Sequence, residues 1–370
     1  MMNNPNQFPL MDSAPGAKTQ FNGAEHLYFG GTGYFGLHND TELLDAAKLA
    51  LDQYGTHSAT TRAGYGNSAQ VQTLEREAAA YFGTEDAVYL ATGYLSDMAG
   101  LQALAAYKQV DVIFIDEFAH YSNKDGAATL NKPMIVFRNA DNDHLETLLK
   151  MHLKPEQKPL VVTDGIFSIE GLAAPIPEHL RLMEKYDGNI WVDDAHGLGI
   201  LGPNGRGVYD HYHLNSPRLF FGGTFAKAFG GFGGIIPGNK EYINHLRQGA
   251  TINSGSYFAP AVAASLAGLR KVNNHPEYRQ QLRDNALYLK SKLKGLGLAV
   301  VDNDLPIVSW TQGSASNMQL IQQNMLKYKI AIQYCHYVGA GDEGILRAVV
   351  FSTHSKDHID QLVKKLKSFI

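Results

Sequence analysis

A lysine set among glycines and small residues is the feature of this chain best suited to carry chemistry. Lys227 lies in the segment 222–231, which directly follows the apolar run 219–221. A lysine amine is costly to desolvate unless it is paired, lowered in pKa or covalently engaged, so this placement suggests a Schiff-base lysine. The alternative is a glycine-rich turn with a solvated lysine at its tip.

Two adjacent carboxylates and a histidine follow a second apolar run. Asp193, Asp194 and His196 come directly after residues 190–192. At the end of a buried strand, such a carboxylate can keep a proton on a heteroaromatic nitrogen, and the imidazole can hydrogen-bond a neighbouring oxygen. The alternative is an Asx-turn carboxylate beside a satisfied core histidine.

A third group of residues is suited to binding an anion. Thr92, Gly93 and Tyr94 stand where an apolar run gives way to a helical pattern. Because the first amides of a helix have no intrahelical partner, this junction is a ready anion site, and a phosphate is its natural occupant. The alternative is a plain helix N-cap.

Other motifs in the chain do not support a function. Two matches to G-x-G-x-x-G start at Gly31 and Gly197, but the first follows no convincing strand and the second runs into a proline that cannot open a helix. A Walker-type phosphate loop is absent from the sequence. We expect no metal site, because His211 and His213 lack further ligands at metal spacing.

The composition is that of an ordinary globular protein. Of 370 residues, 44% are hydrophobic and 18% charged, and the formal net charge of -4 comes without a basic stripe. We therefore expect small-molecule partners and no nucleic acid or membrane surface. The single cysteine, Cys335, excludes an internal disulfide framework, and residues 1–20 do not resemble a signal peptide, so we expect a cytoplasmic protein.

Short apolar runs alternate with helical patterns through the middle of the chain. This alternation predicts an α/β fold with a mainly parallel sheet covered on both faces, in which ligands bind at the carboxyl ends of the strands. The predicted strands are 87–91, 110–115, 135–138, 160–163, 190–192, 219–221 and 234–237. The predicted helices before and between them include 40–53, 68–82 and 94–107.

The two ends of the chain have a different character. Residues 1–23 are polar and proline-punctuated, which predicts an extended arm that packs on a neighbour. After residue 257 come helical stretches, apolar segments at 298–301 and 345–351, and a final helix from near Ser355, which together predict a smaller α+β domain. We therefore divide the chain into 1–40 (the arm and part of the small domain), 41–260 (the large domain) and 261–370 (the small domain).

Taken together, these motifs resemble one enzyme family. In order and spacing, the chain resembles the α-oxoamine synthases, pyridoxal-phosphate (PLP) enzymes of the fold-type I aminotransferase superfamily, from about Ala24 to its end. The segments that carry the resemblance are 92–94, 163–168, 192–197 and 224–230. The resemblance implies a large domain with a seven-stranded, mainly parallel sheet that binds PLP, and a smaller C-terminal α+β domain.

The resemblance assigns roles around the cofactor ring. Lys227 would form the Schiff base with PLP and later move the Cα proton of the substrate, and Asp193 would pair with the pyridine nitrogen. His196 and Ser168 would contact the phenolic oxygen of the ring. His120 matches the histidine that stacks on the ring face.

The resemblance also assigns contacts to the phosphate and the substrate. Phosphate contacts would come from Thr92, Thr224 and the amides of Gly93 and Tyr94. The neighbouring subunit of a homodimer would add one from residues 254–260, for which Ser256 is the candidate. Arg347 matches the arginine that grips the amino-acid carboxylate, and its alternative is a surface arginine on a strand.

The chain departs from the family pattern near the substrate entry. Gly33 stands where the family usually has an asparagine, Val71 stands where a histidine is common, and the usual N-terminal helix is not found ahead of the arm. The implied reaction is condensation of an amino acid with an acyl-CoA thioester, catalysed by a homodimer with shared active sites. The alternatives are a PLP-dependent aminotransferase on the same fold and a non-catalytic PLP-binding protein.

Overall fold

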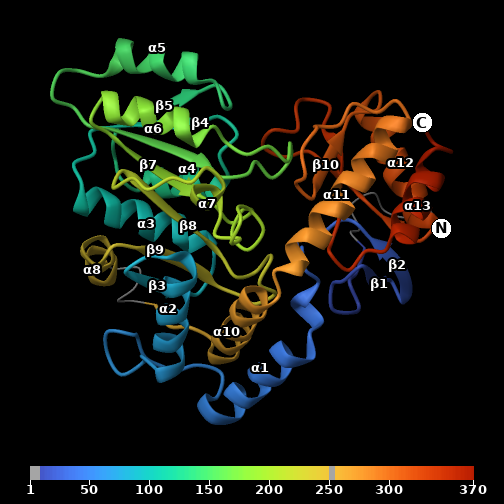
Figure 1. The fold of residues 1–370 in the computed structure, drawn as a ribbon, viewed down its shortest axis with the longest axis horizontal. Helices are drawn as coiled ribbons and strands as arrows, with labels where there is room; N and C mark the ends of the chain where they lie inside the picture. Colours follow the sequence, from blue (N-terminus) through green and yellow to red (C-terminus); the bar gives the residue numbers. More distant parts are fainter. Residues whose placement is uncertain (1–8, 250–254) are drawn as a thin grey trace. The chain divides into compact units, whose positions relative to one another are not determined.

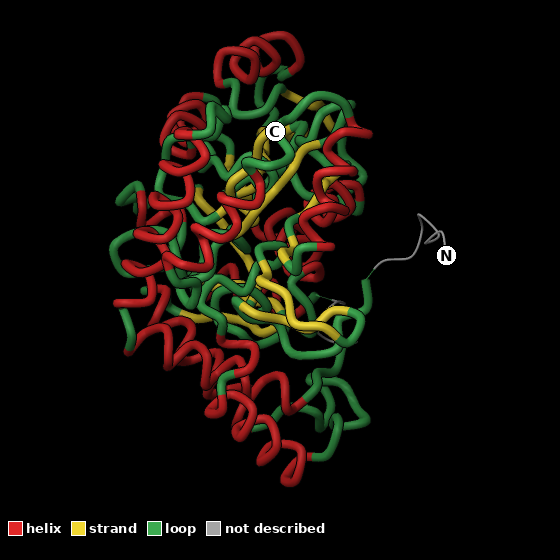
Figure 2. The backbone as a smooth tube through the Cα atoms, turned by 90° about the vertical axis from the view of Figure 1, so that its right-hand side faces the viewer, coloured by secondary structure: helices red, strands yellow, loops and turns green. Residues whose placement is uncertain are grey.

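The computed structural model describes residues 9–249 and 255–370, which fall into two compact units. Of the described residues, unit 1 comprises 9–39, 169–171 and 280–370, and unit 2 comprises 40–168, 172–249 and 255–279. Both units mix helices and strands, as the ribbon of Figure 1 and the tube of Figure 2 show. The chain therefore passes between the units several times.

Unit 2 is built on a seven-stranded sheet with the strand order β3-β9-β8-β7-β6-β4-β5. Neighbouring strands are parallel except where β9 pairs with β3 and with β8. This is the mainly parallel sheet that the sequence predicts. The strands are β3 (Asp86–Leu90), β4 (Val112–Asp116), β5 (Met134–Phe137), β6 (Pro159–Asp164), β7 (Asn189–Asp193), β8 (Leu219–Thr224) and β9 (Gly234–Gly238).

Helices cover both faces of this sheet (Figure 1). Side chains alternate along each strand, so that Trp191 and Phe220 pack with α3, α4 and α8 in one buried cluster, whereas Phe221 faces the other way and contacts Phe82 of α2. The helices of this unit are α1 (Thr41–Tyr54), α2 (Ala69–Phe82), α3 (Tyr94–Tyr107), α4 (Tyr121–Ala128), α5 (Asn142–His152), α6 (Ile176–Lys185), α7 (Val208–His211), α8 (Lys240–Gln248) and α10 (Ala259–Asn274).

Capping residues set the ends of these helices. Asp40 and Ser68 precede α1 and α2, and each side chain accepts a hydrogen bond from an amide in the first turn. Helix α2 ends at Gly83, whose φ of 67° lies in the left-handed region that glycine adopts without strain.

Unit 1 contains two small sheets with strand orders β1-β2-β11 and β10-β13-β12. Its strands are β1 (Lys18–Phe21), β2 (Ala24–Tyr28), β10 (Ile307–Trp310), β11 (Ile330–Ala331), β12 (Gln333–Cys335) and β13 (Ile345–Val349). Its helical segments are η1 (Leu37–Asn39), α12 (Ala315–Lys327), α13 (Lys356–Leu366) and most of α11 (Glu277–Gly295). The predicted apolar stripe of α13 is buried at Ile359, Leu362 and Leu366.

Three expectations from the sequence differ from this fold. Residues 18–23 of the predicted arm form a hairpin with residues 24–28 of their own chain, because Asn22 and Gly23 both adopt positive φ (49° and 72°) in the two-residue turn. Residues 1–8 of that arm lie outside the described part. The segment 298–301 is not a strand, because both edges of β13 are already paired, with β10 and with β12. Helix α10 groups with unit 2, since it packs on α1 and α2, although the sequence puts residues 261–279 in the small domain.

Candidate active site

The carboxyl ends of three parallel strands meet at one edge of the unit 2 sheet. Asp164 of β6 is the register partner of Asp193 of β7, which in turn pairs with Gly222 of β8. The ladder continues beyond the strands, since the amide of Asp194 donates to the carbonyl of Gly222 over 2.8 Å. The predicted carboxylate and the lysine turn that follows β8 thus leave the sheet at the same edge.

Lys227 lies in a tightly bonded turn after β8. The hydroxyl of Thr224 donates to the carbonyl of Gly233 over 2.8 Å and accepts from the amide of Ala226 over 3.0 Å. Lys227 is half-buried between Phe225 and Phe229, both of which are fully buried. The alternative of a solvated lysine at an exposed turn does not describe this position.

The two adjacent carboxylates at the end of β7 occupy different environments. Asp193 is half-buried, and its Oδ1 accepts a hydrogen bond from the amide of Ala195 over 2.9 Å, so the Asx turn named as the alternative is present. Asp194 is fully buried, and its Oδ2 accepts from the amide of Val208 over 2.7 Å. A Cβ atom would stand within 2.3 Å of the Asp194 carboxylate at each of Gly165, Gly197 and Gly207. Asp194 is therefore enclosed by backbone, and Asp193 is the carboxylate left to the crevice.

Electrostatics link these groups to Lys227. Burial raises the pKa values of Asp97, Asp164 and Asp194, and the negative charge of Asp193 raises all three further. The positive charge of Lys227 lowers the pKa values of Asp164 and Asp194. The charges of Asp193 and Lys227 thus act in opposite directions on the pKa values of Asp164 and Asp194.

His120 caps the start of α4 and belongs to the same crevice. Its Nδ1 lies 2.6 Å from the Ser122 hydroxyl, and its amide donates to Oδ1 of Asp164 over 3.0 Å. Burial lowers the imidazole pKa, the Asp193 charge raises it and the Lys227 charge lowers it. The structure therefore brings His120, Asp193 and Lys227 together.

Asp164 is a site residue whose role the sequence analysis missed. It is 3% exposed and accepts hydrogen bonds from the His120 amide and from Nδ2 of Asn123, so it holds the start of α4 in place. Its signal is present in the sequence, because Asp164 ends a buried apolar run as Asp193 does.

The predicted anion site lies where α3 approaches β8. A Cβ at Gly93 would stand 2.7 Å from Cβ of Thr224, so only glycine allows this close approach. The Thr92 hydroxyl accepts from the amide of Leu95 over 3.4 Å, as a helix cap does, and the Thr224 hydroxyl is engaged within its own turn. The donors available to an anion are therefore the first amides of α3, a helix of 14 residues.

Tyr94, at the start of α3, contacts the His120 side of the crevice. Its ring meets the imidazole of His120 edge-on, with ring centroids 6.5 Å apart. Its hydroxyl donates to Oδ2 of Asp125, which raises the phenol pKa. Tyr94 is 43% exposed, so its side chain lines the surface of the crevice and its amide belongs to the anion site.

The structure also describes three further predicted residues. His196 is 8% exposed in the turn after Asp194, and Ser168 is half-buried at the end of the unit 2 segment that precedes Ile169–Gly171. Ser256 is exposed, while Ser254, at the start of its segment, lies outside the described residues. Their contacts with a cofactor remain predictions.

Arg347 belongs to unit 1 and lies in the middle of β13. It is 5% exposed, and its guanidinium donates to Oε1 of Gln333 over 3.1 Å. Burial raises the pKa values of Tyr28 and Tyr34, and the Arg347 charge lowers both. The alternative of a surface arginine does not apply.

The residues of the unit 2 crevice fit PLP. A lysine amine, a carboxylate and an imidazole lie within electrostatic reach of one another, and the start of α3, where Gly93 approaches Thr224, has the amide donors that attract an anion. In residues 9–249 and 255–370, no group of three or more His, Cys, Asp or Glu side chains could hold a metal ion. The helices of that same part include none with the length and apolar character needed to cross a membrane.

Comparison with known proteins gives a consistent result. The model of the family "Aminotransferase class I and II" matches residues 32–366. The chain belongs to this family. Family members named 8-amino-7-oxononanoate synthase are similar to it: that of Alkaliphilus metalliredigens is 30% identical over 98% of this chain and 92% of its own length, and that of Thermosipho melanesiensis is 32% identical over 96% and 91%.

Solved structures of known enzymes are also similar to this chain. Serine palmitoyltransferase of Sphingomonas wittichii has a TM-score of 0.91 with 25% identity, covering 98% of this chain and 91% of its own. Both named enzymes are α-oxoamine synthases, so the predicted membership of that branch and the fold-type I architecture are confirmed.

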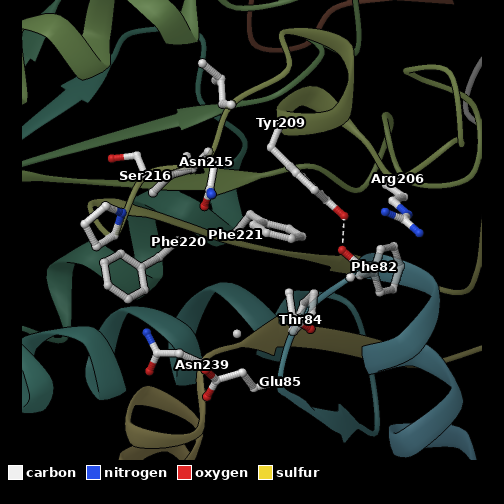
Figure 3. Close-up of a pocket in the computed structure, with 16 residues that line it drawn as sticks. Phe82, Thr84, Glu85, Arg206, Tyr209, Asn215, Ser216, Phe220, Phe221 and Asn239 are labelled. Carbon is white, nitrogen blue, oxygen red and sulfur yellow. Dashed lines mark hydrogen bonds between the residues drawn. The ribbon is translucent and has the colours of Figure 1, made fainter.

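A separate pocket of about 630 Å³ lies elsewhere in unit 2 (Figure 3). Its lining includes Phe82, Arg206 and Tyr209, and the Tyr209 hydroxyl donates to the carbonyl of Phe82. The pocket reaches β8 at its amino end, residues 219–221, whereas Lys227 follows the carboxyl end. It is therefore distinct from the crevice that holds the predicted residues.

Proposed function

We propose that the protein is a PLP-dependent acyltransferase that condenses an amino acid with an acyl-CoA thioester to give an α-oxoamine. The observation that carries the proposal is the meeting of Lys227, Asp193 and His120 at one edge of the sheet, in a chain whose relatives are named as such synthases. When bound, PLP supplies an electron sink for the carbanion formed at Cα.

The crevice residues have separate roles in such a reaction. The Asp193 carboxylate keeps the pyridine nitrogen protonated, and the first amides of α3 hold the phosphate. His120 packs against the ring as a neutral imidazole, in keeping with its lowered pKa. The Lys227 amine moves the proton at Cα, and His196 and Ser168 hydrogen-bond the phenolic oxygen.

Arg347 is our candidate for the substrate carboxylate, because a guanidinium fork matches a planar anion. Unit 1 also suggests which residue replaces the asparagine that the family commonly has at position 33 of this chain. A Cβ at Gly33 would stand 2.8 Å from Nδ1 of His38, so the imidazole of His38 fills the space beside this glycine. We propose that His38 lines the substrate entry in place of that asparagine.

We further propose a homodimer, with a second copy of the chain as partner, and a cytoplasmic location suited to a protein with one free cysteine. Large apolar side chains in unit 2 are exposed at Leu49 (69%), Tyr65 (98%) and Phe258 (50%). The support for a dimer is the resemblance to the α-oxoamine synthases, because apolar residues exposed singly are normal on any protein surface. Sedimentation of the purified protein tests this, and an active monomer would contradict it.

The reaction is tested by incubating the PLP-loaded protein with single amino acids and short or long acyl-CoAs. The proposal expects release of free CoA that depends on both substrates. The family name favours one alternative, an aminotransferase, which would instead convert the cofactor to its amine form with an amino acid alone. That conversion without CoA release would overturn the acyltransferase assignment.

A further inference from the structure

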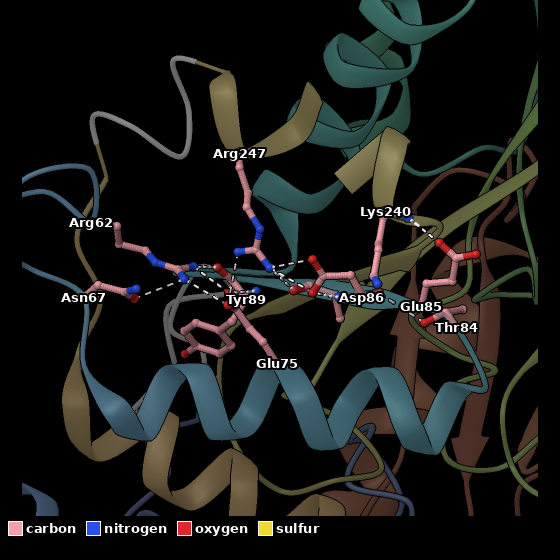
Figure 4. A network of polar contacts seen from close by, with 10 residues as sticks. Arg62, Asn67, Glu75, Thr84, Glu85, Asp86, Tyr89, Lys240 and Arg247 are labelled. Carbon is pink, nitrogen blue, oxygen red and sulfur yellow. Dashed lines mark hydrogen bonds and ion pairs between the residues drawn. The ribbon is translucent and has the colours of Figure 1, made fainter. Parts of the chain in front are cut away.

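Four charged side chains of unit 2 form a network beside β3, on segments that the crevice does not use (Figure 4). Arg62 binds both carboxylate oxygens of Glu75 over 2.7 and 3.0 Å. Arg247 binds both oxygens of Asp86 over 2.9 and 3.1 Å and reaches Oε2 of Glu75 over 3.3 Å. We call Arg62, Glu75, Asp86 and Arg247 the β3 ion network.

The centre of the network is buried and attached to backbone. The side chains of Arg62 and Glu75 are 10% and 5% exposed. Glu75 accepts from the Tyr89 amide over 2.8 Å, and Arg62 donates to the Tyr89 carbonyl over 3.1 Å. Desolvation offsets much of the attraction in a buried ion pair, so such a pair is weak support for stability and better suited to fixing one geometry.

The geometry that the network fixes is that of the segment containing Ser256. The backbone amide of Arg62 donates to the carbonyl of Gly255 over 3.4 Å, and His57 of the same loop forms an antiparallel bridge with Phe258. Arg247 stands in the last turn of α8, ahead of the same segment along the chain. Through Arg62 and Arg247, the carboxylates of Glu75 and Asp86 thus anchor residues 255–258 and the end of α8.

Tyr89 connects this anchor to the turn that carries Lys227. Its ring stacks on Phe225 with centroids 6.3 Å apart, and its hydroxyl donates to the carbonyl of Phe232 over 2.8 Å. On another side the same ring meets Tyr257 edge-on at 6.4 Å. The residue that Arg62 and Glu75 hold by its backbone therefore touches both the Lys227 turn and the Ser256 segment.

We propose that Arg62 and Glu75 are positioning residues, which set the Ser256 segment and the Lys227 turn for PLP without touching it. The inference rests on the proposed function and homodimer, because it takes Lys227 as a contact to the PLP of its own subunit and Ser256 as a contact to the PLP of the neighbouring subunit. Loss of the network then loosens the grip on the cofactor, and PLP leaves the holoenzyme faster.

The chain supplies a matched control on the same helix. Glu77 of α2 pairs with Arg270 over 2.6 and 2.7 Å, but these side chains are 31% and 52% exposed and the pair makes no contact with β3. Comparing Glu75→Gln with Glu77→Gln in the holoenzyme shows whether PLP release depends on where the carboxylate lies or follows from the loss of any ion pair on α2.

The measurement is the rate of PLP release from each holoenzyme, followed by absorbance, beside the melting temperature of each apoenzyme. We expect Glu75→Gln to release PLP about tenfold faster than wild type, a change of about 1.4 kcal/mol, and Glu77→Gln to release it at the wild-type rate. A folded Glu75→Gln protein that releases PLP at the wild-type rate overturns the proposal, whatever its melting temperature.

Arg62→Lys decides the question if Glu75→Gln does not fold. It keeps the charge but cannot bridge both Glu75 oxygens and the Tyr89 carbonyl, so we expect faster PLP release here too. Wild-type release from this variant overturns the proposal. Failure of the proposed function would look different, because the wild-type holoenzyme would then bind PLP and release no CoA from any acyl-CoA.

Discussion

The crevice and the buried interior of unit 2 contain the same kinds of side chain, but their burial and hydrogen bonding differ. In the crevice, Asp193 is half-buried and His120 is bonded to Ser122, each within reach of the Lys227 charge. In the interior, Asp194 and His179 are fully enclosed, and within the described residues Oδ1 of Asp194 and both ring nitrogens of His179 have no hydrogen-bond partner. Residue type therefore does not decide the role of these groups. Their enclosure does, since the Lys227 charge also lowers the pKa of the fully buried Asp194.

The largest effect that we expect is the loss of activity when the crevice loses Lys227. Lys227→Ala removes the proposed acceptor of the Cα proton, and we expect the rate of CoA release to fall by about 10³-fold or more. Lys185→Ala, at an exposed lysine of α6, is the control and should keep wild-type activity. A borohydride-reducible cofactor adduct that persists in Lys227→Ala would sink the assignment of this lysine.

Replacing Asp193 or Asp194 by alanine tests whether these two carboxylates at the end of β7 have different roles. Asp193→Ala should lower kcat by about 10²-fold with little change in the free energy of unfolding. Asp194→Ala leaves the amide of Val208 without its acceptor, so we expect about 3 kcal/mol of lost stability and near-normal activity in the folded fraction. Kinetics and denaturant unfolding of both variants check this, and exchanged effects would contradict the division.

The enclosure of Asp194 can be tested from its glycine wall. A Cβ at Gly207 would stand 1.9 Å from Oδ2 of Asp194, and the φ of Gly207 is 103°. We expect Gly207→Ala to lower the free energy of unfolding by about 3 kcal/mol, from strain and overpacking together. Gly55→Ala shares positive φ (67°) with nothing within 4 Å, so it should cost about 1 kcal/mol. Equal losses in both variants would argue against a tight enclosure.

We expect low pH to destabilise the folded protein through the buried His179. Burial lowers the pKa of His179 to about 4, against 6.5 for an ordinary histidine, so the unfolded state binds more protons between these values. Stability should therefore fall as the pH drops from 6.5 to about 4, by about 1.4 kcal/mol for each pH unit. In His179→Leu this slope should become shallower, and unfolding measured across the range shows whether it does.

Much of the architecture could be predicted because it depends on local pattern. Each of the seven strands of the large sheet overlaps a predicted apolar run, and Asp193 stands where one of these runs ends. The N-terminal hairpin was predictable from Asn22-Gly23, a strong turn signal that composition alone obscured. The apolar segment 298–301, which lies outside every strand, shows the limit of pattern, because an apolar run becomes a strand only where a neighbouring strand pairs with it.

The site was predictable where a motif is contiguous and not where it is assembled from distant segments. Lys227 and the Asp193 motif each lie within a few residues of chain. The β3 ion network joins positions 62 and 247, and its pairing depends on the packing of α2 and α8 on β3. One signal was available: Glu75 stands four residues after Val71 on the apolar face of α2, where a carboxylate needs a partner.

The order in which the units become complete during synthesis follows from how the chain is threaded through them. Unit 2 ends at Arg279, so its sheet can close before the last segments have left the ribosome. In unit 1, β2 pairs in parallel with β11, which joins Leu27 to Ile330. The first hairpin to be made must therefore wait for nearly the whole chain before its sheet can form, and a nascent protein will carry that unpaired edge throughout translation.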